Sequence, residues 1–276
     1  MNGYDTGADA AAAIGTIAFI GGGNMARSLI GGLVARGAPA ESIRVAEPVE
    51  ALRPKKVRTV SSSSEVKDKP DIVVLAVKPQ SMDLVLPDLK RFADAGSVFL
   101  SIAAGKTLKY FAGHLGAAAK VVRSMPNTPA AVRQGITVAT ASKGVSAAEK
   151  KACHELLEAV GQALWVDDEA LLDPVTALSG SGPAYVFLLV EAMAAAGQKL
   201  GLAPEMAMQL ARATVSGSGE LLKQSTEPAA QLRVNVTSPG GTTAEALKVL
   251  MADDGIQPVF DKALAAASRR SKELAG

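Results

Sequence analysis

Short apolar runs alternate with helical segments through the first half of the chain. Each run is continuously apolar rather than alternating, which is typical of strands buried on both faces of a parallel sheet. Helix-spaced apolar residues occupy residues 25–36 and 81–92, between such runs. The predicted strands cover residues 16–21, 43–47, 71–77, 97–104 and 120–125. This alternation predicts an α/β fold that begins with a Rossmann-type, doubly wound sheet.

Two later apolar runs, residues 135–140 and 161–168, flank a predicted helix at 147–160. Both runs are long enough for strands, and we expect them to extend the same sheet. The chain that leads into the first of them, residues 127–134, is short. A short connection allows antiparallel pairing, because only a parallel crossover needs a dozen residues or more.

The chain changes character after Asp168, and no strand is predicted from Leu171 onward. A long helix is predicted over residues 184–202, with Gly201 as a candidate C-cap. Its first half is apolar nearly all round, so it must be buried, and the surrounding segment offers little to bury it. Further helices are predicted at 204–223, 243–251 and 258–274. We therefore expect an all-α domain that completes its core against another subunit.

The predicted organisation has three parts. Residues 1–13 form a flexible extension, residues 14–170 a dinucleotide-binding Rossmann domain, and residues 171–276 a helical domain for dimerisation and substrate binding. The N-terminal segment carries Asp5 and Asp9 and no basic residue, so it does not resemble a signal peptide. No apolar run approaches membrane-spanning length. The expectation is a soluble, cytoplasmic protein without a membrane partner.

Charge and cysteine content exclude several classes of protein. The 276 residues include 29 Lys and Arg against 27 Asp and Glu, and these charges are dispersed. This balance predicts no nucleic-acid partner. The single cysteine, Cys153, excludes an internal disulfide and is expected to be a small, half-buried apolar residue. Its neighbour His154 would point about 100° away on a helix, which makes a poor catalytic dyad. With only two histidines, no metal site is expected.

A glycine-rich loop, "FIGGGNMA", follows the first predicted strand and opens the first helix. Its G-x-G-x-x-A spacing is that of a dinucleotide-binding loop. The first glycine allows the tight turn, the second lets a pyrophosphate approach the backbone, and the alanine permits close packing of helix on strand. A turn that merely packs a helix on a sheet is the alternative. The expected cofactor-binding residues here are Gly21, Gly22, Gly23, Asn24, Met25 and Ala26.

The end of the second predicted strand bears on which cofactor is bound. Glu47 stands where an acidic residue favours the ribose 2′-OH of NADH. Arg53, Lys55 and Lys56 follow closely and could neutralise the 2′-phosphate of NADPH. Alternatively, all four residues are ordinary solvated surface residues. The residues alone leave the choice between NADPH and NADH open.

Other strand ends carry polar or small residues, and ligands bind at the carboxyl ends of strands in such sheets. "AVKP" and "SIAAG" follow two of the strands, and "MPNTPA" follows a third. Lys78 could reach a cofactor phosphate or ribose oxygen, or could pair with a helix carboxylate. Asn127 and Thr128 are candidate polar groups near the nicotinamide. The cofactor-lining residues predicted here are Ala76, Val77, Lys78, Pro79 and Asn127.

A helix-breaking string, "VTSPGGTTAEAL", interrupts the helical half of the chain. Pro239 and the two glycines after it end any preceding helix, and Thr242-x-x-Glu245 has capping-box spacing for the next one. Such a turn exposes several N–H groups at a positive helix end, which suits a carboxylate held by Ser238 and by the backbone near Gly241. A plain turn between helices is the alternative.

Six stretches, in this order and with comparable spacing, resemble those of the pyrroline-5-carboxylate reductase family. They are "IGGGNMA", "LAVKPQ", "SIAAG", "RSMPNTPA", "ALSGSGPAYVF" and "VTSPGGTTAEAL". "SGSGPAY" and "SPGGTT" are the specific ones, since related dehydrogenases share the others. The resemblance implies a Rossmann domain, an intertwined helical dimer that often forms a pentamer of dimers, and NADPH, or NADH in some members, as hydride donor.

The resemblance also assigns residues. It places Ser63 near the adenine, and adds Ile102, Ala103 and Ala104 to the cofactor-lining set. The implied substrate-binding residues are Asn235, Ser238, Gly240, Gly241, Thr242 and Thr243. The chain departs from the family at Glu47, where many members carry a hydroxyl or basic residue. "QSTEPAAQLR" stands one residue out of step, so Glu227 receives no role.

The implied reaction is the reduction of 1-pyrroline-5-carboxylate to L-proline, the last step of proline synthesis. Hydride transfer belongs to the cofactor, so no catalytic histidine is needed. A cyclic imine can enter already protonated, and a hydroxyl that orients the ring nitrogen then suffices. Thr243 is the predicted catalytic residue. Reduction of a related cyclic imino acid, or nucleotide sensing without catalysis, are the alternatives.

Overall fold

The computed structural model describes residues 14–275, and the predicted extension over residues 1–13 lies outside this range. The described chain folds into two compact units. The first contains the chain up to Gly180 together with its end from Ala267, and the second is Ser181–Ala266. The predicted strands and the glycine-rich loop fall in the first unit, and the string "SPGGTT" falls in the second.

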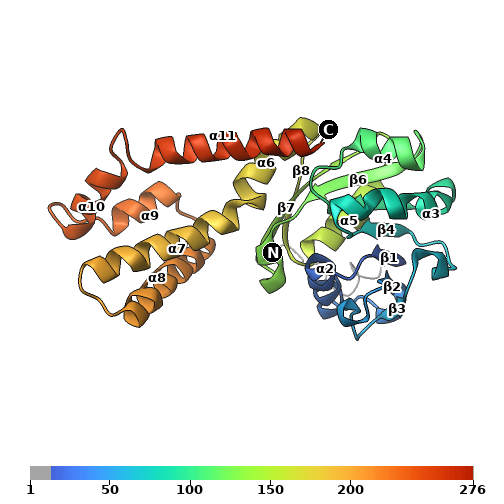
Figure 1. Cartoon of the computed structure of the whole chain (residues 1–276), viewed down its shortest axis with the longest axis horizontal. Coiled ribbons are helices and arrows are strands. Elements are labelled where there is room, and N and C mark those ends of the chain that lie inside the picture. The colour runs from blue at the N-terminus through green and yellow to red at the C-terminus, as the bar shows by residue number, and fades with distance from the viewer. Residues whose placement is uncertain (1–13, 276) are drawn as a thin grey trace, which may run out of the picture. The chain divides into compact units, whose positions relative to one another are not determined.

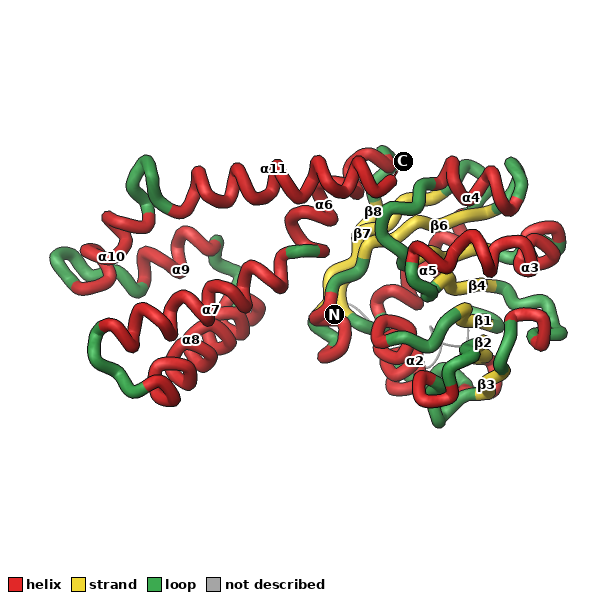
Figure 2. The backbone as a smooth tube through the Cα atoms, viewed as in Figure 1, coloured by secondary structure: helices red, strands yellow, loops and turns green. Residues whose placement is uncertain are grey.

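The first unit is built on an eight-stranded sheet with the order β3-β2-β1-β4-β5-β6-β7-β8. Strands β1 to β6 run parallel, and β7 pairs antiparallel with β6, with Val122 opposite Ala141. β8 pairs parallel with β7. Figure 2 shows these strands in yellow. The strands are β1 Ile17–Ile20, β2 Ile43–Ala46, β3 Arg58–Val60, β4 Ile72–Leu75, β5 Val98–Ser101, β6 Lys120–Met125, β7 Gly135–Ala141 and β8 Gly161–Trp165.

The Rossmann-type fold and the antiparallel extension of its sheet are confirmed. The order places β1 at the crossing point between the β2–β3 and β4–β5 halves, as in other doubly wound sheets. One strand was not predicted. β3 is three residues long and lies beside the basic run after Arg53, so it shows no apolar pattern and forms only through its pairing with β2.

Helices cover both faces of this sheet, which explains the continuous apolar runs. In β1, Ile17 and Phe19 pack into one core with α2 and α5, while Ala18 and Ile20 pack into another with α3 and α4. All of β1 is therefore buried. The helices of this unit are α2 Asn24–Ala35, α3 Met82–Asp94, α4 Leu108–Leu115, α5 Ala147–Glu158 and α6 Leu172–Val175.

The second unit consists of helices within the described residues, as predicted (Figure 1, yellow to red). Leu200, not the expected Gly201, is the C-cap of the first helix, and Gly201 follows it with a φ of +98°. One helix, α9, was not predicted; its seven residues begin directly after Pro228. The helices are α7 Gly182–Lys199, α8 Pro204–Gln224, α9 Ala229–Asn235, α10 Thr242–Leu250 and α11 Ile256–Ala275, whose C-terminal part belongs to the first unit.

One continuous helical run, Glu169–Lys199, corrects an expectation. It has 31 residues and contains a window with a mean hydropathy of 1.3, so it is long and apolar enough to cross a membrane by length and composition. The prediction that no apolar run approaches that length is wrong, because the helical run continues upstream of Ala184 through a π-helical turn, Thr176–Gly180. A single such helix is weak evidence for a membrane span, since a helix that packs against another subunit passes the same test.

Candidate functional site

The glycine-rich loop has the geometry of a phosphate cradle. Gly21 has a φ of +103°, and a Cβ there would lie 2.8 Å from the carbonyl oxygen of Ala76. Nothing lies within 4 Å of a Cβ built on Gly23, so the space above this residue is open. Gly23 is the N-cap of α2 and has no side chain to cap it. Within residues 14–275, no acceptor bonds the N–H groups of Asn24 and Met25. These features fit an anionic pyrophosphate at the helix start.

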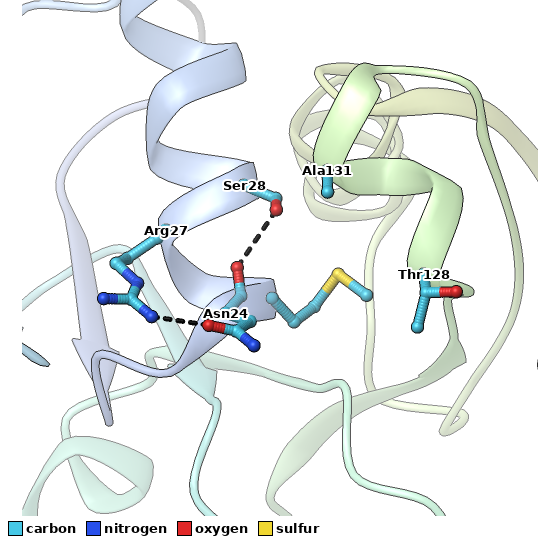
Figure 3. Close-up of a pocket in the computed structure, with 6 residues that line it drawn as sticks. Asn24, Arg27, Ser28, Thr128 and Ala131 are labelled. Atoms are coloured by element: carbon cyan, nitrogen blue, oxygen red, sulfur yellow. Dashed lines mark hydrogen bonds between the residues drawn. The ribbon is translucent and has the colours of Figure 1, made fainter. Parts of the chain in front are cut away.

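The first turn of α2 lines a pocket of about 420 Å³ (Figure 3). Figure 3 shows Asn24 and Ser28 facing Thr128 and Ala131 across it, with Arg27 directed away. Arg27 donates to the Asn24 side chain, and Ser28 Oγ donates to the Asn24 carbonyl at 3.0 Å. Sequence reasoning missed Arg27 and Ser28. Their positions one and two residues after the motif, in the same helical turn, were the available signal.

Glu47 is buried beside this loop, with 6% of its surface exposed. Its Oε2 accepts the N–H of Gly22 at 2.7 Å, and its Oε1 accepts that of Val49 at 2.9 Å. Arg53 does not pair with this carboxylate. Its Nε donates instead to the Glu47 carbonyl at 2.8 Å, and its Nη2 to the Pro48 carbonyl at 3.3 Å. The interpretation of Glu47 as a solvated surface residue is therefore wrong.

The strand end after β4 borders the glycine loop, and the strand end after β5 lies next to that of β4 in the sheet. Ala76 contacts Gly21, as described above, and Lys78 is exposed at the start of a 3₁₀ turn that begins with Pro79. Among residues 14–275, the Lys78 side-chain ammonium has no ion-pair or hydrogen-bond partner, so the alternative of a helix carboxylate is not realised. Of the predicted lining residues, Ala103 is buried, Val77 and Ile102 are half-buried, and Ala104 is exposed.

Asn127 and Ser63 are both largely buried, and the side chain of each forms a hydrogen bond within the protein. Asn127 Oδ1 accepts the N–H of Ile136 at 3.0 Å, which directs the amide nitrogen away from that backbone and leaves it without a partner in the described chain. Ser63 has 7% of its surface exposed, and its hydroxyl lies 3.5 Å from Asp88 of α3. Asn127 thus retains a donor for a ligand, whereas Ser63 faces a helix.

Cys153 and Tyr110 are titratable groups outside the predicted site. Cys153 is fully buried rather than half-buried, and burial raises the pKa of its thiol to about 12. Burial also raises the pKa of the Tyr110 hydroxyl, which donates to Asp83, and this hydrogen bond lowers the pKa of the Asp83 carboxyl. The Cys153 thiol and the Tyr110 hydroxyl therefore keep their protons at neutral pH. No group of three or more His, Cys, Asp or Glu side chains between residues 14 and 275 could hold a metal ion.

The turn before α10 forms the second half of the predicted site. Gly240 has a φ of +70°, which favours glycine. A Cβ on Gly241 would lie 2.6 Å from Ser238 Oγ, so the absence of a side chain lets this hydroxyl lie over the helix start. Within the described chain, the N–H groups of Thr242 and Thr243 have no acceptor. The turn therefore presents backbone donors and a hydroxyl at one helix end.

The predicted capping box does not form. Gly241, not Thr242, is the N-cap of α10, so Thr242 is the first helical residue. Glu245 is then not at the position that reaches back to the N-cap, and its Oε1 accepts from Lys248 at 2.6 Å. Because no side chain caps this helix in the structure, its first N–H groups remain free to bind a ligand.

Asn235 closes α9 just before the turn. Its Nδ2 donates to Glu227 Oε2 at 2.9 Å, and its Oδ1 accepts from Gln231 at 2.8 Å. Both sides of the amide are thus used within the unit. Glu227, which received no role from the sequence, holds Asn235 in place.

Comparison with known proteins matches both halves of the chain. Residues 169–274 match a family model described as pyrroline-5-carboxylate reductase dimerisation, and residues 16–105 match one described as NADP oxidoreductase, coenzyme F420-dependent. The pyrroline-5-carboxylate reductase of Pseudomonas aeruginosa is 48% identical over 264 residues, which are 94% of this chain and 96% of that protein.

Solved structures give the same match. A pyrroline-5-carboxylate reductase from Coxiella burnetii superposes with a TM-score of 0.90 at 39% identity, over 95% of this chain and 99% of that one. The Plasmodium falciparum pyrroline carboxylate reductase, solved with NADP bound, gives 0.82 at 31% identity, over 95% of this chain and 98% of that one. The likeness extends through both compact units.

Proposed function

Because this chain belongs to the pyrroline-5-carboxylate reductase family, we propose that it reduces 1-pyrroline-5-carboxylate to L-proline with NAD(P)H. The observation that carries this proposal is the match at 48% identity over 94% of the chain. The two segments matched by family models, residues 16–105 and 169–274, include the glycine loop and the turn before α10. The family match favours this reaction over nucleotide sensing, since a sensor has no need for a carboxylate-binding turn.

The cofactor half of the proposed site is the loop from Gly21 to Ala26 with its neighbours. The open space above Gly23 and the free N–H groups of α2 would hold the pyrophosphate. Lys78 would neutralise a phosphate, and the Asn127 amide nitrogen would donate to the nicotinamide carboxamide. When bound, NAD(P)H supplies the hydride for the imine carbon. The protein itself binds and orients the cofactor and the imine, and it keeps water out of the site.

The substrate half of the proposed site is the turn before α10. The first-turn N–H groups at Thr242 and Thr243 and the Ser238 hydroxyl would bind the substrate carboxylate, with the positive end of the helix dipole adding to the attraction. The Thr243 hydroxyl would orient the ring nitrogen, which carries its proton as an iminium. Asn235, held by Glu227 and Gln231, would shape the approach to the turn.

We also propose the arrangement of the chain in the cell. The segment matched as a dimerisation domain supports a homodimer, formed through residues 171–276, and assembly of dimers into a decamer is the further expectation. A cytoplasmic location is proposed from the sequence alone.

A direct assay tests the function. The purified full-length chain is mixed with 1-pyrroline-5-carboxylate and either NADH or NADPH, and both cofactor oxidation and proline formation are measured. Turnover with at least one cofactor is expected. Faster turnover of the six-membered cyclic imino acid would favour the related-substrate alternative. Cofactor binding without turnover of either imine would favour nucleotide sensing and overturn the reductase.

A further inference from the structure

The carboxyl end of β2 is built around one buried carboxylate, that of Glu47. Both of its oxygens accept backbone N–H groups, one from Gly22 at 2.7 Å and one from Val49 at 2.9 Å. These two bonds fix the side chain in one orientation against the glycine loop. Glu47 therefore presents a carboxylate of fixed position at the end of β2.

In doubly wound folds, the residue at this position contacts the adenosine ribose of a bound dinucleotide. In doubly wound folds an acidic residue about 20 residues after the glycine loop accepts the adenosine ribose 2′-OH, and NADP-binding sites place a cation there instead. The contact with Gly22 puts the Glu47 carboxylate directly beside the loop that fits the pyrophosphate. Each carboxylate oxygen has further lone pairs for a ribose hydroxyl.

The cations nearby either bond backbone carbonyls or are exposed to solvent. The Arg53 guanidinium donates to the carbonyls of Glu47 and Pro48. Lys55 and Lys56 are exposed beyond it, where solvent and salt screen their charge. The two residues after Glu47, Pro48 and Val49, have no side-chain donor. The end of β2 therefore offers a fixed carboxylate acceptor, and the Arg53 guanidinium beside it is held by two backbone carbonyls.

We propose that this chain prefers NADH over NADPH and that Glu47 determines the preference. Its carboxylate accepts the ribose 2′-OH of NADH and repels the 2′-phosphate of NADPH. This departs from the first expectation of NADPH, and from the NADP held by the Plasmodium falciparum relative. The inference rests on the proposed reductase, because it concerns cofactor selection at that site, but cofactor affinity can be measured without turnover.

Titration calorimetry of the full-length chain with NADH and with NADPH, without imine, tests the proposal. The wild-type chain should bind NADH at least about tenfold more tightly, a difference of about 1.4 kcal/mol. Glu47→Gln and Glu47→Ser should each lower the NADH-to-NADPH affinity ratio by about tenfold. The NADH-to-NADPH affinity ratio of the wild-type chain should also fall as salt is added, because salt screens the repulsion between the Glu47 carboxylate and the 2′-phosphate of NADPH.

Glu50→Gln is the matched control. Glu50 lies three residues further on, in the exposed 3₁₀ turn Glu50–Leu52, and this change removes the same charge. The affinity ratio of Glu50→Gln should equal that of the wild type. Two results would overturn the proposal: tighter binding of NADPH by the wild-type chain, or an unchanged ratio in both Glu47 variants. Failure of the reductase proposal is distinct, since it would appear as absent turnover with the cofactor affinities intact.

Discussion

Single residues in the turn before α10 carry the proposed substrate chemistry. Ser238 Oγ lies over the helix start because Gly241 has no side chain, and Thr243 stands in the first helical turn. Neither hydroxyl has a hydrogen-bond partner elsewhere in the described part of the chain, in contrast to Thr237, whose Oγ1 donates to the Arg233 carbonyl at 2.6 Å. The two hydroxyls are therefore available to a ligand, whereas Thr237 holds the end of α9.

Paired substitutions at Thr243 test the role of its hydroxyl. Thr243→Ala should lower kcat by roughly 10- to 100-fold, because a hydrogen bond to a charged group is worth about 1.5–3 kcal/mol. Thr243→Ser keeps the hydroxyl and should restore most of the activity. Steady-state kinetics with 1-pyrroline-5-carboxylate measure both variants. Wild-type kcat and KM in Thr243→Ala would remove this residue from the mechanism.

At the scale of elements, α2 joins the glycine loop to the core. Its two central glycines, Gly31 and Gly32, are adjacent, but Gly32 is packed against another segment and Gly31 is not. A Cβ on Gly32 would lie 2.2 Å from the carbonyl oxygen of Ala159, directly after α5, whereas nothing lies within 4 Å of one on Gly31. The close approach of α2 to the end of α5 thus depends on one glycine.

These two positions make a paired stability test. Gly32→Ala should destabilise the protein by about 1–3 kcal/mol, because overpacking forces the helices apart. Gly31→Ala should stabilise it by up to about 1 kcal/mol, since alanine favours helix over glycine. Urea unfolding followed by circular dichroism measures both. If both substitutions changed the free energy of unfolding equally, helix propensity rather than packing against Ala159 would explain the effect.

In the whole molecule, the hydrophobic core of the second unit is small for a unit of this many helices. Its buried cluster in the described chain consists of Ala194, Ala207 and Ala211, all small residues. On α7, by contrast, Phe187 and Leu188 are each 62% exposed. Exposed apolar helices of this kind mark a surface that is covered in the assembled protein. The match of residues 169–274 to a dimerisation family identifies the partner as a second copy of the chain.

Phe187→Glu should therefore weaken the assembly. A charge buried in an apolar interface costs several kcal/mol, and each dimer would contain two. Sedimentation analysis should show a shift toward monomer of more than about tenfold in dissociation constant. Leu84→Glu, at a residue 80% exposed on α3 outside the matched segment, should leave the assembly unchanged. A wild-type chain that remains monomeric at micromolar concentration would contradict the shared core, and its mass in the same experiment tests the proposed decamer.

Features that depend on neighbours along the chain could be predicted from the amino-acid sequence. Apolar runs revealed strands buried on both faces, and the spacing of Gly21, Gly23 and Ala26 revealed the loop that opens α2, because periodicity and turn chemistry are local. The sequence also placed the break before α10 at Pro239. These local signals were sufficient for the fold class and for the two helix starts, at Asn24 and Thr242, where the cofactor and the substrate are proposed to bind.

Features that depend on residues far apart in the chain became visible only in the folded protein. β3 has no apolar pattern and exists through its pairing with β2. Gly31 and Gly32 are equivalent in sequence and differ only because the chain at Ala159 returns beside one of them. The role proposed for Glu47 rests on a hydrogen bond to Gly22, 25 residues away, and on an Arg53 that bonds carbonyls instead of the carboxylate. Charge spacing along the chain could not reveal either contact, because folding sets which groups meet.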